Sequence, residues 1–374
     1  MSQDATHDPI PLPLAALHAE LGARMVPFAG HAMPVQYPMG VMAEHVHTRT
    51  HAGLFDVSHM GQVVLEGDGA AAALERLAPM NAVDLPAGRQ RYGVLLNDRG
   101  GILDDLMVAN HGERLVLVVN GATKHVDMDV LRAGLPDHAP RLLKDRALLA
   151  LQGPAAEDAL ATVVPAVASM RFMDAASNDW QGADLWISRS GYTGEDGFEV
   201  SLPVDAAEPF ARALLAHDAV APIGLGARDS LRLEAGMPLY GQDLTPEVTP
   251  VEAGLAWSIP KVRREGGARE GGFAGAERIL GELTDGPSRI RVGLAPRGRA
   301  PMRAGTMLYA DGAATAPLGT VTSGGFGPTV GAPVAMGYVP AGTAAGTVLM
   351  GDVRGRRLPV AVTDLPFHTP RYKR

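Results

Sequence analysis

The sequence predicts an α+β protein of several domains, whose C-terminal part forms a small β-barrel or sandwich. The chain has 374 residues, which is enough for more than one hydrophobic core. It contains 45 glycines and 29 prolines, and this abundance of turn-forming residues favours many short strands over long helical bundles. From residue 289 to 367, almost every segment has the pattern of a short strand, with turns at intervals of about ten residues.

The region before this β-rich part mixes strands and helices. Strands are expected at 61–67, 114–122 and 147–154, and a hairpin is expected at 184–203 with its turn at 193–197. Helices are expected at 10–22, 41–55 (ended by Gly53), 70–78, 123–134, 155–164, 206–217 and 226–236. Residues 28–40, rich in Gly and Pro, are expected to be irregular, and the charged segment 261–272 is the best candidate for a domain boundary.

Composition and charge exclude several classes of function. The formal net charge of −8 gives no general attraction for nucleic acid or anionic membranes, so an anionic partner would have to meet a local basic patch. No apolar run approaches the roughly 20 residues that span a bilayer, and the first ten residues lack the features of a signal peptide. The absence of cysteine rules out disulfides, thiolate metal sites and cysteine nucleophiles. We therefore expect a soluble, cytoplasmic protein.

Two adjacent aspartates stand in NDRGGILDDLMV (97–108), a segment that otherwise has the pattern of a buried strand. Neighbouring side chains of a strand point to opposite faces, so Asp104 and Asp105 are expected on different faces. A carboxylate on an apolar face needs hydrogen-bonding partners or a cavity. The pattern alone leaves two interpretations open: a buried structural aspartate, or a carboxylate that serves a functional site.

Two further stretches carry charged side chains near glycines. Arg228 follows two glycines near the start of an expected helix, where the backbone permits close approach and a guanidinium can bind a carboxylate. A dinucleotide-binding loop is not expected there, because the third glycine is missing and no preceding strand is expected to begin a βαβ unit. The stretch SGYTGEDGFEV (190–200) places Tyr192 before a turn and Glu199 after it.

A pair of histidines resembles a zinc site only in its spacing. His47 and His51 are four residues apart on an expected helix, as in many zinc pairs. The HExxH pattern is missing, so we expect no metal.

Six motifs together resemble the T-protein (aminomethyltransferase) family of the glycine cleavage system. They are GLFDVSHMG (53–61), NDRGGILDDLMV (97–108), LQGP (151–154), GYTGEDGFE (191–199), GLGARDSLRLEAGMPLYGQD (224–243) and TSGGFGPT (322–329). The resemblance runs nearly end to end and implies a three-domain cloverleaf around a central folate pocket. The implied domains are a discontinuous first domain of residues 1–58 and 147–265, an inserted α+β domain of residues 59–146, and a C-terminal β-barrel of residues 285–374.

The resemblance also implies a reaction and its partners. An aminomethyl group held on the lipoyl arm of the H-protein would be passed to tetrahydrofolate, with release of ammonia and formation of 5,10-methylenetetrahydrofolate. The implied partner is the lipoylated H-protein, with transient contacts to the other glycine cleavage components and none to nucleic acid or membrane. Two alternatives share the fold: a tetrahydrofolate-dependent demethylase of a small methylated substrate, and a folate-binding protein without catalysis.

The resemblance assigns roles to residues that match its motifs. Asp105 is the implied catalytic carboxylate, which stabilises the electron-poor one-carbon unit, and Asp104 is then structural. The implied folate-binding residues are Glu199, Arg228, Tyr372, Asn120, Tyr192, Met60 and Tyr92, with Trp257 as a further match. The alternatives without a functional role are an exposed strand glutamate for Glu199, an ion pair at a helix start for Arg228 and a surface position for Tyr372.

Two positions depart from the family pattern. His31 stands where the family usually has Trp, and Ala109 stands where many members have a Tyr that lines the pocket. These changes put local folate contacts in doubt without removing a charged role. Four arginines are candidates for meeting an acidic carrier: Arg289, Arg291, Arg297 and Arg299.

Overall fold

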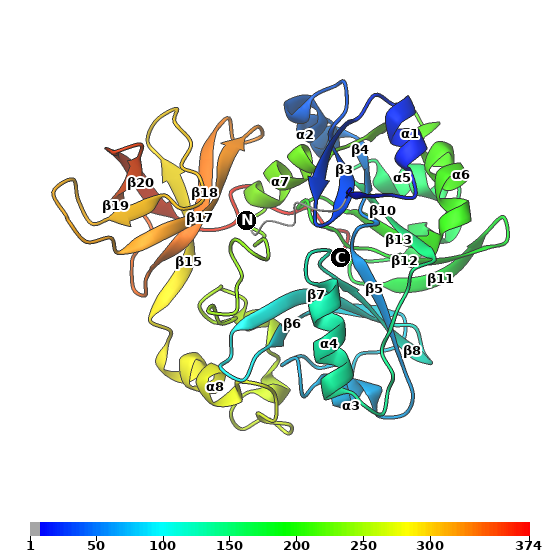
Figure 1. The fold of residues 1–374 in the computed structure, drawn as a ribbon, viewed down its shortest axis with the longest axis horizontal. Coiled ribbons are helices and arrows are strands. Elements are labelled where there is room, and N and C mark those ends of the chain that lie inside the picture. The colour runs from blue at the N-terminus through cyan, green and yellow to red at the C-terminus, as the bar shows by residue number, and fades with distance from the viewer. Residues whose placement is uncertain (1–7) are drawn as a thin grey trace.

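Three lobes surround a common centre in the computed structural model of the chain (Figure 1). The structure describes residues 8–374, so residues 1–7 of the expected first domain lie outside the described part. Two lobes are built on open β-sheets and the third is a closed barrel. The predicted α+β cloverleaf with a C-terminal barrel is therefore confirmed.

The six-stranded lobe contains a mixed sheet in the order β11-β12-β13-β10-β4-β14. Strand β4 precedes residues 59–146 and β10 follows them, yet the two strands pair directly, with Leu149 opposite Asp56. The chain therefore leaves this sheet, builds a second lobe and returns to its starting point. The strands are β4 (Ala52–Asp56), β10 (Arg146–Gln152), β11 (Ala175–Trp180), β12 (Ala183–Ser188), β13 (Gly197–Pro203) and β14 (Val220–Pro222).

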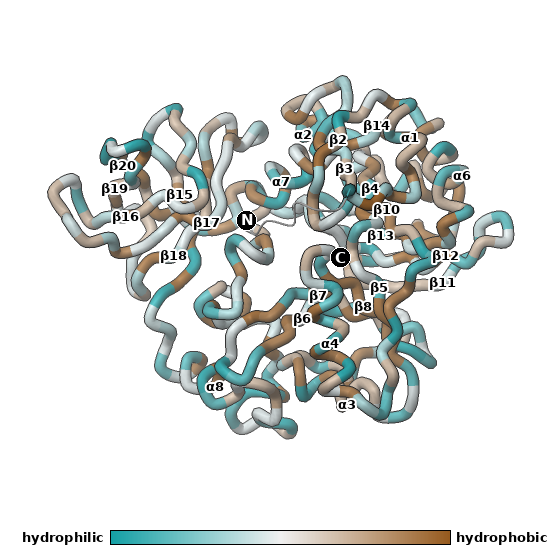
Figure 2. Tube along the Cα trace, in the orientation of Figure 1, coloured by the Kyte–Doolittle hydropathy of each residue, from teal (hydrophilic) through white to brown (hydrophobic). Residues whose placement is uncertain are grey.

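Side chains that alternate along β10 divide the core of this lobe into two layers. Leu149 and Leu151 pack in a cluster with α5 and α6, whereas Leu148 and Ala150 pack in a second cluster with α7. Because both faces of the sheet are covered, residues 147–151 of β10 are all hydrophobic (Figure 2). The helices of this lobe are α1 (Ala15–Glu20), α2 (Val41–Thr50), α5 (Ala156–Ala161), α6 (Val204–Leu215) and α7 (Leu225–Glu234), with a 3₁₀ turn at Pro165–Ser169.

The inserted lobe contains an antiparallel sheet in the order β6-β7-β8-β5-β9. Helices α3 and α4 cover one face, where Leu74 and Leu131 meet Leu106 and Leu117 of the sheet. The other face therefore remains available to the centre of the molecule. The elements are β5 (Gly61–Glu66), α3 (Ala70–Leu74), β6 (Arg89–Leu96), β7 (Ile102–Asn110), β8 (Arg114–Val119), α4 (Lys124–Gly134) and β9 (Arg141–Leu142).

The barrel closes in the order β15-β18-β17-β16-β19-β20 around its own hydrophobic core. Helix α8 (Ala276–Asp285) precedes it, and two 3₁₀ turns, Ala256–Ser258 and Lys261–Arg263, come earlier. In the charged segment 261–272, Arg263 and Arg269 both contact Glu75, so this segment packs on the inserted lobe. The expected domain limits stay predictions. The strands are β15 (Arg289–Pro296), β16 (Met307–Tyr309), β17 (Gly319–Gly327), β18 (Ala332–Pro340), β19 (Val348–Val353) and β20 (Arg356–Thr363).

The expectation of an irregular segment at 28–40 is wrong. Strands β2 (Arg24–Phe28) and β3 (His31–Gln36) form a hairpin, and β1 (Ile10–Pro11) pairs with β3. The two-residue turn consists of Ala29 and Gly30, which have φ values of 49° and 76°. Positive φ at both central positions matches the right-handed twist of the strands, so the turn closes a hairpin despite the nearby prolines.

The expected end of the helix at 41–55 is also wrong. Helix α2 ends at Thr50, and Gly53 lies inside β4 rather than at a helix end. A Cβ atom at position 53 would lie 2.6 Å from Thr48 Oγ1 and 2.7 Å from Ile223 Cγ1, so glycine is required by close packing. A short strand, β14, precedes α7, but the next strand along the chain, β15, belongs to the barrel, so β14 begins no βαβ unit, as predicted.

Candidate active site

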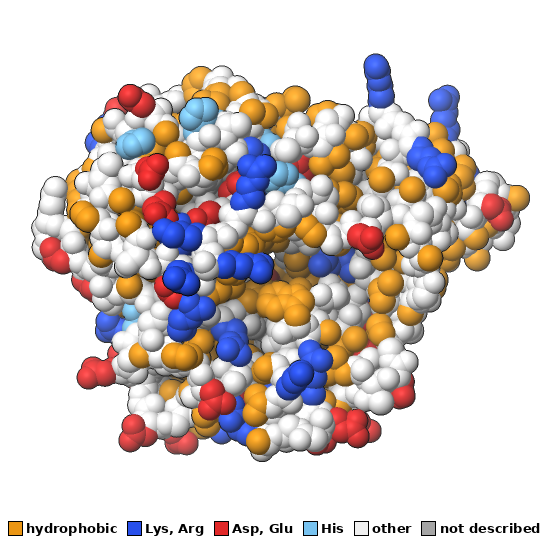
Figure 3. Space-filling view, turned by 180° about the vertical axis from the view of Figure 1, so that it is seen from behind, with side chains coloured by type: hydrophobic (Ala, Val, Ile, Leu, Met, Phe, Trp, Pro, Cys, Tyr) orange, Lys and Arg blue, Asp and Glu red, His pale blue; other side chains and the backbone are white. Residues whose placement is uncertain are grey.

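A cavity of about 360 Å³ lies where the lobes meet. Its walls combine the inserted sheet, the six-stranded sheet, the segment after α7 and the end of the chain beyond the barrel. At the centre of the face in Figure 3, hydrophobic side chains lie in a hollow bordered by Lys and Arg. All eight residues predicted for the site line the cavity: Met60, Tyr92, Asp105, Asn120, Tyr192, Glu199, Arg228 and Tyr372. A concave, largely apolar pocket with a few convergent polar groups is typical of small-molecule sites.

Asp105 reaches the cavity from β7, and Met107, two residues along the strand and on the same face, also lines the cavity. The Asp105 carboxylate accepts a hydrogen bond from Asn120 Nδ2 at 2.8 Å and one from Tyr92 Oη at 3.2 Å. Burial, together with the charge of Asp104, raises the pKa of Asp105 to about 7. This carboxyl can therefore gain or lose a proton near neutral pH.

Asp104 lies outside the cavity lining and is fully buried. Its carboxylate accepts hydrogen bonds from the backbone nitrogen of Asn120 at 3.0 Å and from Asn120 Nδ2 at 2.9 Å. The same side-chain amide thus contacts both aspartates. The two side chains leave opposite faces of β7, as expected, but Asn120 lies just beyond the end of the neighbouring strand β8 and reaches both.

Glu199 and Arg228 approach the cavity from the six-stranded lobe. Glu199 of β13 accepts a hydrogen bond from Ser190 Oγ at 3.2 Å. Burial raises its pKa, while the nearby charge of Arg228 acts in the opposite direction. Within residues 8–374, Arg228 Nη1 has no hydrogen-bond partner, and its guanidinium carbon lies 5.0 Å from the centre of the Tyr192 ring. Arg228 therefore presents a donor that a ligand can use.

Aromatic rings form two of the cavity walls. Tyr372 stacks on Phe172 with 4.2 Å between ring centres, and Tyr92 lies beside Trp257 at 5.2 Å. Trp257 is 62% exposed, so this ring stands at an open edge of the site. These flat surfaces suit a planar heterocyclic ligand.

The segment that carries Tyr372 crosses from the barrel back to the six-stranded lobe. The backbone nitrogen of His368 donates to the Glu234 carbonyl at 2.9 Å, and that of Arg371 donates to the Gly194 carbonyl at 3.0 Å. The backbone nitrogen of Phe172 in turn donates to the Lys373 carbonyl at 2.8 Å. Tyr372 is thus fixed in the wall of the cavity rather than placed on a free surface.

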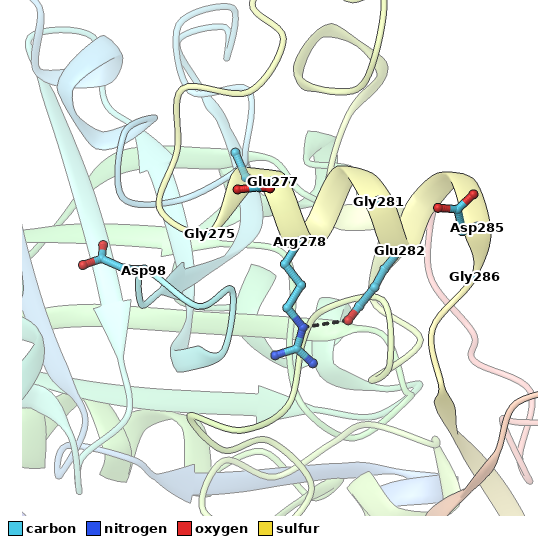
Figure 4. Close-up of a pocket in the computed structure, with 9 residues that line it drawn as sticks. Asp98, Gly275, Glu277, Arg278, Gly281, Glu282, Asp285 and Gly286 are labelled. Atoms are coloured by element: carbon cyan, nitrogen blue, oxygen red, sulfur yellow. Dashed lines mark hydrogen bonds and ion pairs between the residues drawn. The ribbon is translucent and has the colours of Figure 1, made fainter.

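A larger open groove lies elsewhere, beside α8, with a volume of about 640 Å³. Its charged lining residues are Asp98, Glu277, Arg278, Glu282 and Asp285 (Figure 4). Arg278 donates to Glu282 at 2.8 Å, so its charge is already paired. No predicted site residue lines this groove, and we place the candidate active site in the central cavity.

Two family models match the chain. The model described as the GCVT N-terminal domain matches residues 14–263, and the model of the glycine cleavage T-protein C-terminal barrel domain matches residues 289–368. The chain belongs to the glycine cleavage T-protein family.

Similar proteins agree with this placement in the T-protein family. A mitochondrial aminomethyltransferase of Dictyostelium discoideum is 41% identical over 380 residues, covering 96% of this chain and 93% of the relative. An aminomethyltransferase of Synechococcus elongatus is 40% identical, covering 95% of each chain. The crystal structure of glycine cleavage system aminomethyltransferase T from Bartonella henselae matches with a TM-score of 0.91 and 44% identity, covering 98% of this chain and 100% of that chain. These matches confirm the predicted family and the predicted enzyme class, aminomethyltransferase.

The two departures from the T-protein pattern have different positions. His31 Nε2 lies 3.0 Å from Lys124 Nζ, and His31 is absent from the cavity lining. Ala109 lines a small space of about 30 Å³ that shares Met107, Val118 and Glu199 with the central cavity. Ala109 thus lines a separate small cavity that adjoins the central one.

Other side chains singled out from the sequence have internal contacts. Arg289 donates to Glu252 at 3.1 Å, and Arg291 donates to the carbonyls of Ala253 and Gly236. Arg297 and Arg299 are exposed.

His47 Nε2 bonds the Ala219 carbonyl at 3.0 Å, and His47 stacks on His51. Within residues 8–374, no three acidic or histidine side chains gather as metal ligands.

Several cavity residues were missed by the sequence reasoning. They include Phe172, Met173, Ser190, Met237 and Tyr240. Ser190 directly precedes a T-protein motif and could have been found from it. Phe172 carries no such signal, because its position depends on backbone pairing with residue 373, far away in the chain.

Proposed function

We propose that this enzyme transfers a one-carbon unit from the aminomethylated lipoyl arm of the H-protein to tetrahydrofolate, releasing ammonia. The observation that carries the proposal is the position of Asp105, whose carboxylate faces an aromatic cavity and is hydrogen-bonded by Asn120 and Tyr92. The products would be 5,10-methylenetetrahydrofolate and the dihydrolipoyl carrier.

Asp105 supplies the negative charge that this reaction needs. The one-carbon unit becomes electron-poor when its bond to sulfur or nitrogen breaks, and a fixed carboxylate in a site shielded from water stabilises that charge. Because burial raises the pKa of Asp105 to about 7, the same group can take a proton from a folate nitrogen at neutral pH.

The remaining cavity residues fit tetrahydrofolate. Glu199 would accept hydrogen bonds from the amino and ring N–H groups of the pterin, and Asn120 can both donate and accept at a heterocycle edge. The unpartnered Arg228 Nη1 is suited to a carbonyl or carboxylate of the ligand. Met60, Tyr92, Tyr192 and Tyr372 offer apolar or aromatic surfaces for the flat rings.

The partner and location are also part of the proposal. Arg297 and Arg299 are exposed beside the barrel and could meet an acidic carrier. We keep the cytoplasm as the proposed location, although the Dictyostelium discoideum relative is mitochondrial. None of the helices in residues 8–374 combines the length and apolarity that crossing a bilayer requires.

Single-turnover product formation tests the proposal. Purified protein is mixed with aminomethyl-loaded H-protein, with and without tetrahydrofolate, and methylenetetrahydrofolate and ammonia are followed. We expect tetrahydrofolate-dependent release of both products. If tetrahydrofolate binds but neither product forms, the transferase proposal is wrong, and demethylation of small methylated substrates is the next assay.

A further inference from the structure

Besides Asp104, another acidic side chain lies on the side of the inserted sheet that faces away from the cavity. Asp127, on α4, is fully buried, and neither of its carboxyl oxygens has a hydrogen-bond partner of good geometry within residues 8–374, although the Thr123 hydroxyl lies close enough to lower its pKa. It lies within hydrogen-bonding reach of Asp104, whose own carboxylate accepts two hydrogen bonds from Asn120. Asn120 also donates to Asp105. Three carboxyl groups therefore form a continuous line from the core of the inserted lobe to the cavity.

Within the described residues 8–374, no cation stands out beside these three carboxyl groups. The groups that most strongly affect the pKa values of Asp104, Asp105 and Asp127 include no arginine or lysine. Two fully buried carboxyl groups in contact cannot both be charged without a cation, so one of them holds a proton. Asp104 receives two N–H donors and Asp127 receives none, which places the charge on Asp104 and the proton on Asp127.

We propose that Asp104 and Asp127 form a buried carboxyl pair that keeps one proton on Asp127 and one negative charge on Asp104. This charge fixes the amide of Asn120 and thereby positions Asp105, and its repulsion keeps Asp105 able to accept a proton near neutral pH. Asp104 and Asp127 are positioning residues, since neither lines the cavity. The inference rests on the proposed role of Asp105 in one-carbon transfer.

The surroundings of the buried carboxyl pair support one charge rather than two or none. Both groups lie near the start of α4, where the helix dipole favours negative charge. Burial raises the pKa values of both carboxyls, and the charge of Asp104 adds to the increase for Asp127. Lys124, on the same helix, does not neutralise them, because its Nζ donates to the His59 carbonyl at 3.0 Å.

The other titratable groups near these carboxyls are tyrosines that stay neutral. Tyr92 faces Asp105 from β6, Tyr192 faces it from the loop before β13, and burial raises the pKa of each phenol. Tyr240, in the segment after α7, lies near all three carboxyls, and burial together with their charges raises its pKa to about 12. Asp104 is therefore the charged group that most directly controls Asp105.

Carbon-13 titration of the aspartate carboxyls in the ligand-free protein tests the inference without any substrate. In the unchanged protein we expect one carboxyl of the buried pair to remain protonated at pH 8 while the other is ionised. This measurement needs no substituted protein. If both carboxyls are ionised at pH 8, the inference is wrong even if the enzyme transfers one-carbon units as proposed.

Three substitutions then separate charge from packing. Asp104→Asn removes the charge beside Asp105, so the midpoint of Asp105 should fall by about one pH unit or more. Asp127→Asn retains a donor for Asp104 and should leave the midpoint of Asp105 unchanged. Asp127→Leu removes the donor and should lower the midpoint of Asp105, as Asp104→Asn does. Asp129→Asn, on the same helix but with its side chain 81% exposed, is the matched control. A midpoint for Asp105 that does not move in Asp104→Asn overturns the inference.

The pH profile of single-turnover transfer gives a second, functional measurement. The acidic limb should move to lower pH in Asp104→Asn and Asp127→Leu and stay in place in Asp127→Asn and Asp129→Asn. A purely structural role for the buried carboxyl pair would change the rate at every pH without moving the limb. That result, together with an unmoved carbon-13 midpoint, would assign Asp104 and Asp127 to packing alone.

Discussion

Two regions of this molecule bury acidic side chains in opposite ways. Between the barrel and the six-stranded lobe, Glu195 and Glu234 are paired with Arg49, and His45 and His368 complete the set, which we call the charged network. In the inserted lobe, Asp104 and Asp127 are buried and Asp105 is half-buried, and within residues 8–374 no arginine or lysine is among the groups that most affect the pKa values of the three. Both clusters lie close to the centre of the fold, but only the second reaches the cavity.

The pKa values of Glu234 and Asp105 move in opposite directions as a result. Burial alone would raise the pKa of Glu234, but hydrogen bonds from His45 and from the backbone at Val330 lower it to about 2. Burial and the charge of Asp104 instead raise the pKa of Asp105 to about 7. A compensated carboxylate holds lobes together and never changes its charge near neutral pH. An uncompensated carboxyl is less stable as an anion, and this makes it available for proton transfer.

The largest expected difference between the regions is catalytic. Asp105→Asn should lower the single-turnover rate by about 10³-fold, because the amide neither stabilises positive charge nor accepts the proton. Rates with aminomethyl-loaded H-protein measure the effect, and circular dichroism checks the fold. Asp98→Asn, at the exposed turn between β6 and β7, is the matched control and should keep the full rate. An Asp105→Asn enzyme with unimpaired turnover would remove the catalytic assignment.

The charged network should respond to substitution through stability. Glu234→Gln leaves Arg49 and His45 without one buried carboxylate, and we expect a loss of about 3 kcal/mol in the free energy of unfolding. Urea unfolding measures this loss. The control is Glu208→Gln, which removes a solvent-exposed ion pair with Arg212 and should change stability by less than about 1 kcal/mol. Equal effects of the two substitutions would contradict the distinction between the regions.

The smallest expected difference is in the dependence of stability on pH. The folded pKa of Asp105 is raised from 3.8 to about 7, so its contribution is present at low pH and is lost as the pH rises through 7. Asp105→Asn should therefore raise the melting temperature at pH 8 by about 2–4 °C. The folded pKa of Glu234 is lowered from 4.5 to about 2, so its contribution is lost only as the pH falls toward 2. Calorimetric scans from pH 3 to 8 compare the two, and a lower melting temperature of Asp105→Asn at pH 8 would contradict the sign.

The sequence was sufficient where local pattern decides the structure. The strands around Val64, Leu117 and Leu149 were expected because apolar runs mark them, and the barrel was expected from its regular turns. The β2–β3 hairpin was missed because its prolines and glycines are typical of loops, while its pairing depends on β1 and on packing. Gly53 was assigned to a helix end because its close approach to Thr48 and Ile223 is a tertiary contact.

The site was predictable to the extent that motifs carry it. Five of the eight predicted residues lie in the six motifs, whereas Tyr92, Asn120 and Tyr372 were matched to family positions outside them, and all eight line one cavity. Phe172 and Asp127 could not be found in this way. The position of Phe172 depends on backbone pairing with Lys373. Asp127 is an acid on an otherwise ordinary amphipathic helix, and its role is evident only from its position beside Asp104.

The return of the chain from the barrel to the six-stranded lobe has a consequence for folding. Tyr372 reaches the wall of the cavity because His368 and Arg371, which follow the last strand of the barrel, bond to the six-stranded lobe. Two folded sheets without the docked barrel therefore enclose an unfinished site. Because contacts between distant segments cost loop-closure entropy, we expect the cavity to be completed when the C-terminal segment docks. Molecules in which this segment is undocked should bind a ligand more weakly.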